Sequence, residues 1–244
     1  MSETLLEVKQ LTKRFGGFTA LENISFSIAA GERLALIGPN GSGKSTTVNC
    51  IAGFFKPDHG EVKFNGEVLN AIPPHGRIRL GIARTFQIPK PFASMTVLEN
   101  IEIPLIYANR TKERLADKVS RLAYAMDILD SVGLGDKAGA LSSSLTQVDM
   151  RKLELARAIA ASPKLLIADE VMAGLSATEV DEILKLLLSL KDRGIAVLLI
   201  EHIMRAVMSF SDRVIVFVAG KKIADDVPSV VINNPEVVRA YLGE

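Results

Sequence analysis

The chain contains one cysteine in 244 residues, Cys50, so it cannot form a disulfide within itself. A lone thiol is typical of proteins in a reducing compartment. An excess of charge is missing as well, because 29 basic side chains are balanced by 28 acidic ones and the net charge is +1. Proteins that bind nucleic acid by neutralising many phosphates carry a basic surplus, so we expect no nucleic-acid partner.

Long apolar runs are also absent. IAVLLI and VIVFVAG are among the longest, and they are far shorter than the roughly 20 residues that a membrane-spanning helix requires. The opening MSETLLEVKQ has two glutamates and no apolar stretch, so we expect that it is not a signal peptide. A content of 48% hydrophobic and 23% charged residues is that of an ordinary globular protein. If the protein acts at a membrane, a partner must hold it there.

Short apolar runs alternate with helical patterns along much of the chain. RLALI, KLLIAD and IAVLLIE predict buried strands, and ATEVDEILKLLLSLKDRG predicts a helix between the last two. This alternation indicates an α/β fold with a mainly parallel sheet. Near the N-terminus, LLEVKQLTKRF and TALENISFSI predict an antiparallel β region that turns at Gly16-Gly17.

A helical segment interrupts the α/β pattern from about residue 95 to residue 141. Five apolar side chains recur there at helical spacing and predict the buried face of one helix: Leu115, Val119, Leu122, Met126 and Leu129. We therefore expect a single domain over 1–244, with an α/β core formed by 1–87 and 151–244 and an inserted helical subdomain at 88–150.

The octapeptide GPNGSGKS, residues 38–45, has the spacing of a phosphate-binding loop and lies between a predicted strand and a predicted helix. Glycines let backbone N–H groups curl around a phosphate chain, and the helix directs its positive end at the same anion. Lys44 is expected to contact the β- and γ-phosphates of a nucleotide, and Ser45 to hold Mg²⁺. A glycine-rich turn with a surface lysine is the alternative, which the flanking strand and helix disfavour. The expected nucleotide-binding residues of this loop are Gly38, Pro39, Asn40, Gly41, Ser42, Gly43, Lys44, Ser45 and Thr46.

A second motif, LLIADE, is a buried strand that ends in two carboxylates, Asp169 and Glu170. The first is placed to orient the water shell of Mg²⁺, and the second to polarise an attacking water as a general base. An apolar run followed by two acids is common, and it gains significance here from the phosphate loop.

Three further residues stand where strand-like runs end: Gln87, His202 and Phe15. In open α/β sheets, ligands bind at the carboxyl ends of the strands, which favours a role for Gln87 and His202. Phe15 can stack a base on its ring. A loop glutamine, a core histidine and a core phenylalanine are the alternatives for each residue taken alone.

With these pieces in this order, the chain resembles the nucleotide-binding subunit of ATP-binding cassette (ABC) transporters, nearly from end to end. KRFGGFTAL, RTFQIPKPFASMTVLEN, LLIEHIMRAVM and NPEVVRAYLGE are similar to one of the paired ATPases of branched-chain amino acid importers. The resemblance implies a P-loop NTPase core with an N-terminal antiparallel β subdomain and an inserted helical subdomain. It also implies an ATPase that uses ATP and Mg²⁺ to power the uptake of a small solute.

The same resemblance implies partners and residue roles. The partners are a second ABC ATPase, integral membrane permease subunits at the cytoplasmic face of the membrane and, indirectly, a periplasmic or surface solute-binding protein. Phe15 matches the aromatic residue that stacks on adenine, and Thr146 matches a signature residue that contacts nucleotide. Ser45, Gln87 and Asp169 are the implied metal contacts, and the implied catalytic residues are Lys44, Glu170 and His202.

One stretch departs from the family pattern. The signature loop of the family has leucine, serine, a variable residue, glycine and glutamine, whereas this chain has LTQVD at 145–149. Thr146 and Asp149 predict a capping box. Val148 adds a β-branched side chain beside the backbone, and Asp149 adds a negative charge where a γ-phosphate would bind. Each site of such a dimer combines one chain's phosphate loop with the partner's signature loop. We therefore expect a weak signature loop that impairs the partner's site, and a heterodimer.

The chain departs from the family pattern at two further positions. Val171 replaces a usual proline, and Ser176 a usual aspartate or asparagine.

Two alternative functions stay open. A soluble ABC ATPase of DNA repair or the ribosome is one alternative, although such chains usually carry two cassettes or long insertions. A nucleotide-binding regulatory partner with little hydrolysis is the other, favoured by the altered signature and disfavoured by Glu170 and His202.

Overall fold

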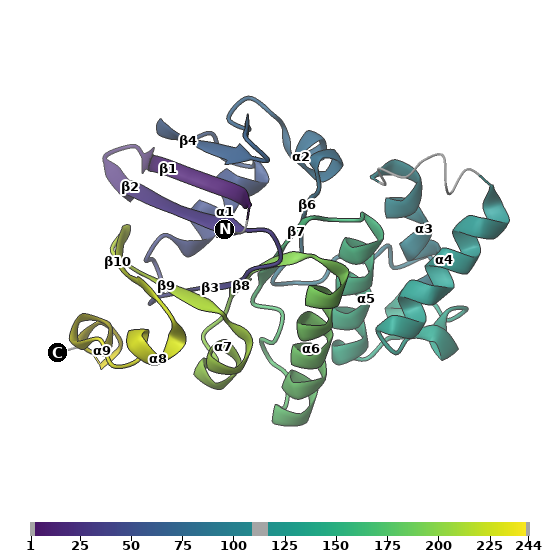
Figure 1. The fold of residues 1–244 in the computed structure, drawn as a ribbon. Coiled ribbons are helices and arrows are strands. Elements are labelled where there is room, and N and C mark those ends of the chain that lie inside the picture. The colour runs from purple at the N-terminus through teal and green to yellow at the C-terminus, as the bar shows by residue number, and fades with distance from the viewer. Residues whose placement is uncertain (1–2, 109–116, 243–244) are drawn as a thin grey trace.

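The computed structural model describes residues 3–108 and 117–242. An antiparallel sheet formed mostly by the N-terminal part of the chain lies over a larger, mainly parallel sheet (Figure 1). The strand order of the smaller sheet is β2-β1-β4-β5. Its strands are β1 (Thr4–Phe15), β2 (Phe18–Ala29), β4 (His59–Phe64) and β5 (Glu67–Val68).

The larger sheet has the order β10-β9-β3-β8-β7-β6. Its strands are β3 (Arg33–Ile37), β6 (Ile82–Arg84), β7 (Leu165–Asp169), β8 (Ala196–Ile200), β9 (Arg213–Val218) and β10 (Lys221–Asp226). Neighbouring strands pair in parallel from β9 to β6, and β10 pairs with β9 antiparallel. The predicted fold class is therefore confirmed, including the antiparallel N-terminal region.

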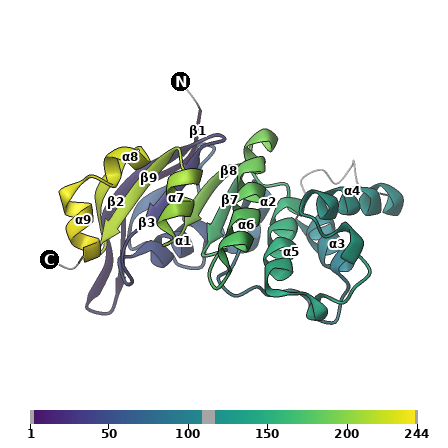
Figure 2. The same ribbon diagram turned by 90° about the horizontal axis from the view of Figure 1, so that it is seen from below.

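Helices cover both faces of the larger sheet. They are α1 (Lys44–Ala52), α2 (Pro74–Leu80), α3 (Val97–Tyr107), α4 (Lys118–Ser131), α5 (Gln147–Ala160), α6 (Ala177–Ser189), α7 (Met204–Phe210), α8 (Pro228–Val231) and α9 (Pro235–Leu242). Short 3-10 turns occupy Gly135–Lys137, Ser142–Ser144 and Leu190–Arg193. Seen from below, α5, α6 and α7 lie side by side along one face (Figure 2).

Side chains of the larger sheet alternate between two cores, because successive residues of a strand point to opposite faces. Leu34 and Leu36 of β3 pack with α1 and the smaller sheet, whereas Ala35 and Ile37 pack with α7, α8 and α9. On β7 and β8 the side chains that point to this second face pack against α5 and α6 instead. With both faces buried, the strands read as continuous apolar runs.

The helical insertion, α3 and α4, lies at the end of the molecule away from β1 and β2 (Figure 1). Its predicted apolar face is partly wrong. Leu129 is buried, but Val119 is 78% exposed, and Ala125 and Ile128 complete the buried face. Near Val119 the contact between α3 and α4 is polar, since Arg121 pairs with Glu102 at 3.5 Å. Leu122 and Met126 are partly buried, and the predicted Leu115 lies outside the described residues.

A buried arginine joins α1 to the following loop. Arg77 is 2% exposed, and its guanidinium donates hydrogen bonds to the carbonyl oxygens of Cys50 and Ile51 at the end of α1. It also donates to the carbonyls of Leu69 and Ile72. The positive charge thus lies at the carbonyl end of α1, where the helix dipole favours it.

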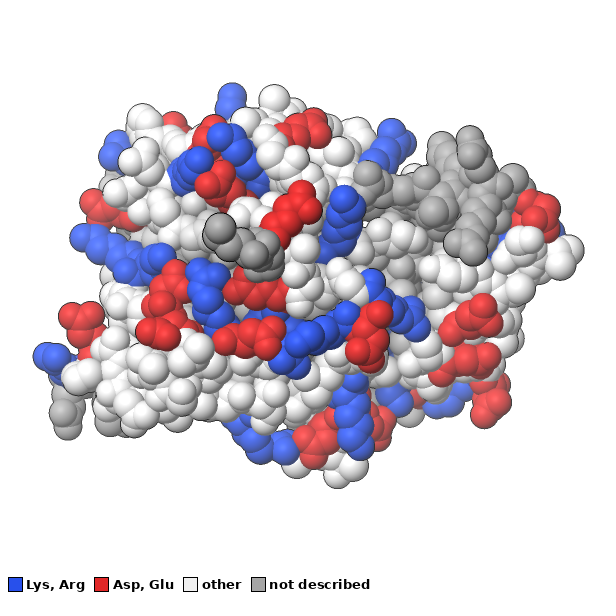
Figure 3. All heavy atoms as spheres, viewed as in Figure 1, with Lys and Arg blue, Asp and Glu red and all other residues white. Residues whose placement is uncertain are grey.

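The surface seen in Figure 3 carries basic and acidic side chains interleaved across its middle. This arrangement is consistent with the balanced charge of the sequence. Within residues 3–108 and 117–242, none of the helices combines the length and the apolar character needed to cross a bilayer.

Candidate nucleotide-binding and catalytic site

The loop at 38–45 leaves the carboxyl end of β3 and enters α1. Gly38 and Gly43 have φ values of 148° and 103°, a region that favours glycine. A Cβ atom at Gly38 would lie 2.2 Å from the carbonyl oxygen of Phe217, and one at Gly43 would lie 2.6 Å from Leu21 Cδ2. Both positions therefore require glycine, so that the loop can pack closely on β9 and β2.

Polar groups of this loop and of α1 are turned inward. Lys44 Nζ donates to the carbonyl oxygens of Gly38 at 2.7 Å and Pro39 at 3.0 Å. Burial lowers the pKa of Lys44, and the charges of Glu170 and Asp169 oppose that shift. Among the described residues, the buried hydroxyls of Ser42 and Thr47 have no hydrogen-bond partner. An ammonium group, backbone amides, hydroxyls and nearby carboxylates suit a polyphosphate with a hard divalent cation, so ATP and Mg²⁺ fit this donor set.

Two carboxylates lie at the end of β7. Asp169 is 7% exposed, and its Oδ2 accepts a hydrogen bond from Arg84 at 2.8 Å. Glu170 has a left-handed backbone, with a φ of 49°, and its amide donates to the carbonyl of Ile200. Gln87 Nε2 donates to Glu170 Oε2 at 2.6 Å. The structure therefore brings Gln87 and Glu170 into contact, and the charges of both carboxylates act on Lys44.

His202 and Phe15 occupy the edges of this region. His202 is exposed and follows β8, the strand between β3 and β7. Phe15 is 44% exposed and meets the ring of Phe55 edge-on, with 5.3 Å between centroids. Lys13 Nζ lies 5.4 Å from the centroid of Phe15. This edge-on contact suits a residue that stacks on a base, and the roles of Phe15 and His202 stay predictions.

The signature segment forms the start of α5. Thr146 is the N-cap and accepts from the amide of Asp149 at 3.3 Å, as the capping prediction requires. The carboxylate of Asp149 does not return to the amide of Thr146. It accepts instead from the Thr146 hydroxyl at 2.7 Å and from Lys137 Nζ at 2.5 Å.

Asp149 lies in the first turn of α5, where its charge was expected, but that charge is paired. Asp149 is 5% exposed and forms an ion pair with Lys137. Burial alone would raise its pKa. The hydrogen bonds from Lys137 and Thr146, together with the positive charge of Lys137, hold that pKa below its usual value. Val148 packs against the core beneath α5. None of the hydrogen bonds of Thr146 or Asp149 within the described parts of the chain reaches the phosphate loop.

The two smaller departures have plain structural roles. Val171 is 1% exposed and belongs to the core. Ser176 caps α6 in a full capping box with Glu179, whose carboxylate accepts from the Ser176 amide at 2.8 Å and hydroxyl at 2.7 Å.

Sequence reasoning missed the side chains of α5 that hold the Gln87 segment. Arg151 donates to the carbonyl of Gln87 at 2.7 Å, and Glu154 accepts from the amide of Phe86 at 2.8 Å. Arg157 donates to a backbone carbonyl farther along the same segment, at Lys90. Their spacing of three residues puts them on one face of α5, and that spacing was the available signal. Arg84, which binds Asp169, was missed as well.

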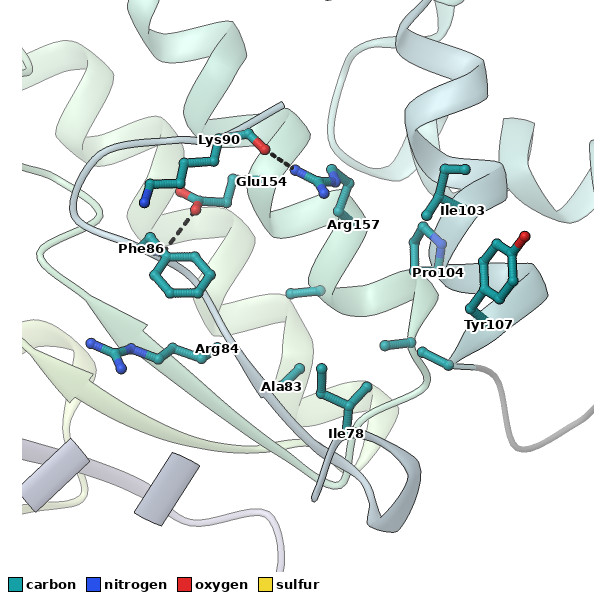
Figure 4. Close-up of a pocket in the computed structure, with 13 residues that line it drawn as sticks. Ile78, Ala83, Arg84, Phe86, Lys90, Ile103, Pro104, Tyr107, Glu154 and Arg157 are labelled. Carbon is teal, nitrogen blue, oxygen red and sulfur yellow. Dashed lines mark hydrogen bonds between the residues drawn. The ribbon is translucent and has the colours of Figure 1, made fainter. Parts of the chain in front are cut away.

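A hollow of about 370 Å³ opens between β6, the Gln87 segment, α3 and α5. Figure 4 shows Arg157 on α5 between Glu154 on one side and Ile103 and Pro104 of α3 on the other, with its guanidinium turned toward the carbonyl of Lys90. Arg84 lies at the same hollow, although its guanidinium contacts Asp169. The hollow is thus distinct from the phosphate loop and connected to it through Arg84.

Comparisons with known proteins agree with this geometry. The ABC transporter family model matches residues 21–173, and a branched-chain amino acid ATP-binding cassette transporter model matches 221–244. The chain is similar to the high-affinity branched-chain amino acid transport ATP-binding proteins BraF of Pseudomonas aeruginosa (36% identity) and LivG of Escherichia coli (37%), with full coverage of all chains. The solved ADP conformation of an ABC transporter cassette is 33% identical, with full coverage of both chains and a TM-score of 0.89.

Proposed function

The chain belongs to the ABC transporter family, and we propose that it is the ATP-hydrolysing subunit of an importer of branched-chain amino acids. The observation that carries the proposal is that the glycine loop and Lys44 lie beside Asp169 and Glu170, at the carboxyl ends of the parallel strands β3 and β7. The printed names of full-length relatives support the solute class.

The residues around the loop divide the work of hydrolysis. Phe15 stacks on adenine, while Lys44 and the loop amides bind the phosphates. Ser45, Gln87 and Asp169 hold the cation, which when bound supplies positive charge to the phosphate oxygens. In the structure Gln87 Nε2 donates to Glu170, whereas a cation binds an amide through its oxygen, so one side chain can contact both groups.

Glu170 and His202 act on the reacting groups. Glu170 orients an attacking water and accepts its proton, and His202 contacts the γ-phosphate. Glu170 has a left-handed backbone, with a φ of 49°. A φ of this kind is uncommon outside glycine and clusters at functional sites.

Permease subunits are the proposed partners at the hollow beside Gln87, and with them we propose a location at the cytoplasmic face of the membrane. Apolar Ile103 and Pro104 and the cations Lys90 and Arg157 line this hollow. A helix of a permease that presents apolar side chains and a carboxylate complements such a lining. A solute-binding protein contributes indirectly, through the permease.

We also propose a heterodimer with a second ABC ATPase. The Thr146 hydroxyl already donates to Asp149 and is not free to donate to a phosphate. This supports a weak signature loop for a reason other than charge repulsion. A Val148→Gly, Asp149→Gln variant tests it. The isolated wild-type chain should hydrolyse ATP slowly and the variant faster, whereas fast and equal turnover would contradict the heterodimer.

The importer function is tested in membrane vesicles that hold the chain with its permease subunits and solute-binding protein. We expect ATP-dependent uptake of leucine, and loss of uptake with retained ATP binding in Glu170→Gln. Robust hydrolysis that needs no permease and responds to nucleic acid would favour a soluble ATPase. Tight ATP binding with uptake unaffected by Glu170→Gln would favour a regulatory partner. The boundary of the helical subdomain at 88–150 stays a prediction.

A further inference from the structure

Arg84, the last residue of β6, binds two acceptors with its two terminal nitrogens. Nη2 donates to Asp169 Oδ2 at 2.8 Å, and Nη1 donates to Asn49 Oδ1 at 2.6 Å. Its side chain is 13% exposed. Asn49 belongs to α1, the helix that follows the phosphate loop. A planar guanidinium with both terminal nitrogens engaged cannot turn without losing one of these bonds.

Two aromatic rings contact the same guanidinium, Phe86 of the Gln87 segment and Phe54 just after α1. Its central carbon lies 5.3 Å from the centroid of Phe86 and 5.8 Å from that of Phe54. The two rings contact each other edge-on, with 6.5 Å between centroids. Arg84 therefore joins three parts of the site, which are α1, the carboxylate of β7 and the segment that leads to Gln87.

The ion pair does more than join two strands. β6 and β7 already pair in parallel register, with Arg84 opposite Ile167, so the strands do not need it. The contact instead fixes one carboxylate oxygen of Asp169. Among the described residues no group is hydrogen-bonded to the other oxygen, Oδ1, which stays available to a ligand.

We propose that Arg84 is a positioning residue that holds Asp169 in place and thereby sets the Mg²⁺ affinity of the nucleotide site. The inference rests on the proposed function, in which Asp169 orients the cation. A partner that holds a ligating carboxylate contributes about 10- to 100-fold to metal affinity in protein sites. The positive charge of Arg84 also repels Mg²⁺, which opposes this gain in affinity. Whether the Mg²⁺ affinity falls or rises when Arg84 is replaced therefore shows which effect is larger.

The test separates metal binding from nucleotide binding. A fluorescent ATP analogue is titrated into the purified chain in EDTA and at increasing free Mg²⁺, for wild type, Arg84→Met and Arg84→Lys. We expect Arg84→Met to need about tenfold more Mg²⁺ for half-saturation while its affinity in EDTA stays within about twofold of wild type. Arg84→Lys keeps the charge but not the two-pronged contact, so its Mg²⁺ requirement should be intermediate.

Asn49→Ala is the third variant, because it removes one acceptor of the guanidinium without altering Asp169. Its Mg²⁺ requirement should rise less than that of Arg84→Met. Thermal melting selects the folded variants, and Asn49→Ala decides the question if Arg84→Met does not fold. An unchanged or lowered Mg²⁺ requirement in the folded variants would overturn the inference. If the wild type itself shows no Mg²⁺-dependent binding, the proposed ATPase function fails instead.

Discussion

Replacing Glu154 by glutamine tests how a buried carboxyl affects the stability of this fold. Glu154 is 7% exposed, and its Oε2 has no hydrogen-bond partner among the described residues. The pKa of this carboxyl is raised from 4.5 to about 7, mainly by burial. The charge of Asp169 adds to this rise, whereas the hydrogen bond from the Phe86 amide and the charges of Arg151 and Arg157 oppose it. Glutamine keeps the oxygen that accepts from Phe86 and removes the charge.

The sign of the effect follows from proton binding. Between pH 4.5 and about 7 the folded chain holds a proton on Glu154 that the unfolded chain has lost, so stability falls as pH rises. Each pH unit corresponds to about 1.4 kcal/mol, which gives a loss of about 3 kcal/mol across this window. Above pH 7 the penalty is complete, and below pH 4.5 it vanishes.

Thermal melting from pH 4.5 to pH 8 measures the difference. Glu154→Gln should match wild type at pH 4.5 and melt about 6 to 12 °C higher at pH 8, as about 3 kcal/mol implies for a chain of this size. Glu182→Gln is the matched control, because its side chain is 44% exposed and pairs with Lys152 at the surface. Such pairs contribute about 0–1 kcal/mol, so the control should follow wild type.

Two results would refute this reasoning. Parallel melting curves for wild type and Glu154→Gln would show that the carboxyl ionises in the fold without penalty. A lower melting temperature for the variant at pH 8 would show that the carboxylate gains more from Arg151 and Arg157 than it loses by burial.

Three further substitutions have expected outcomes. Arg77→Met leaves buried carbonyls of α1 and its loop unpaired and should lower the unfolding free energy by about 3 kcal/mol or more in urea denaturation, with ATP affinity retained. Gly43→Ala forces a Cβ to within 2.6 Å of Leu21 at a φ of 103° and should abolish binding of a fluorescent ATP analogue, with a lower melting temperature. Lys137→Met removes the partner of Asp149 and should cost about 1 kcal/mol at pH 7. Because the folded pKa of Asp149 is lowered, that stabilisation is present above its unfolded pKa and is lost at lower pH, so the two melting curves should converge below about pH 4.

The sequence alone predicted the elements that depend on nearby residues. The phosphate loop is recognisable because its glycines, lysine and serine fall within eight residues between a strand and a helix. The α/β fold followed from apolar runs that both faces of the sheet bury. The capping box of Thr146 and Asp149 followed from a spacing of three residues, and the structure confirms the cap by Thr146 but not the return bond from Asp149 to the Thr146 amide.

Tertiary structure decided what distant residues do to one another. The charge of Asp149 is compensated by Lys137, which lies in a separate turn before α5. Arg84 meets Asp169 across 85 positions of sequence, because β6 and β7 are neighbours in the sheet although an inserted helical segment separates them in the chain. Periodicity misplaced the apolar face of α4, since Val119 is exposed where a polar pair joins α3 to α4. Local patterns thus identify the groups that carry chemistry, but only the fold determines which charges they face and which are paired.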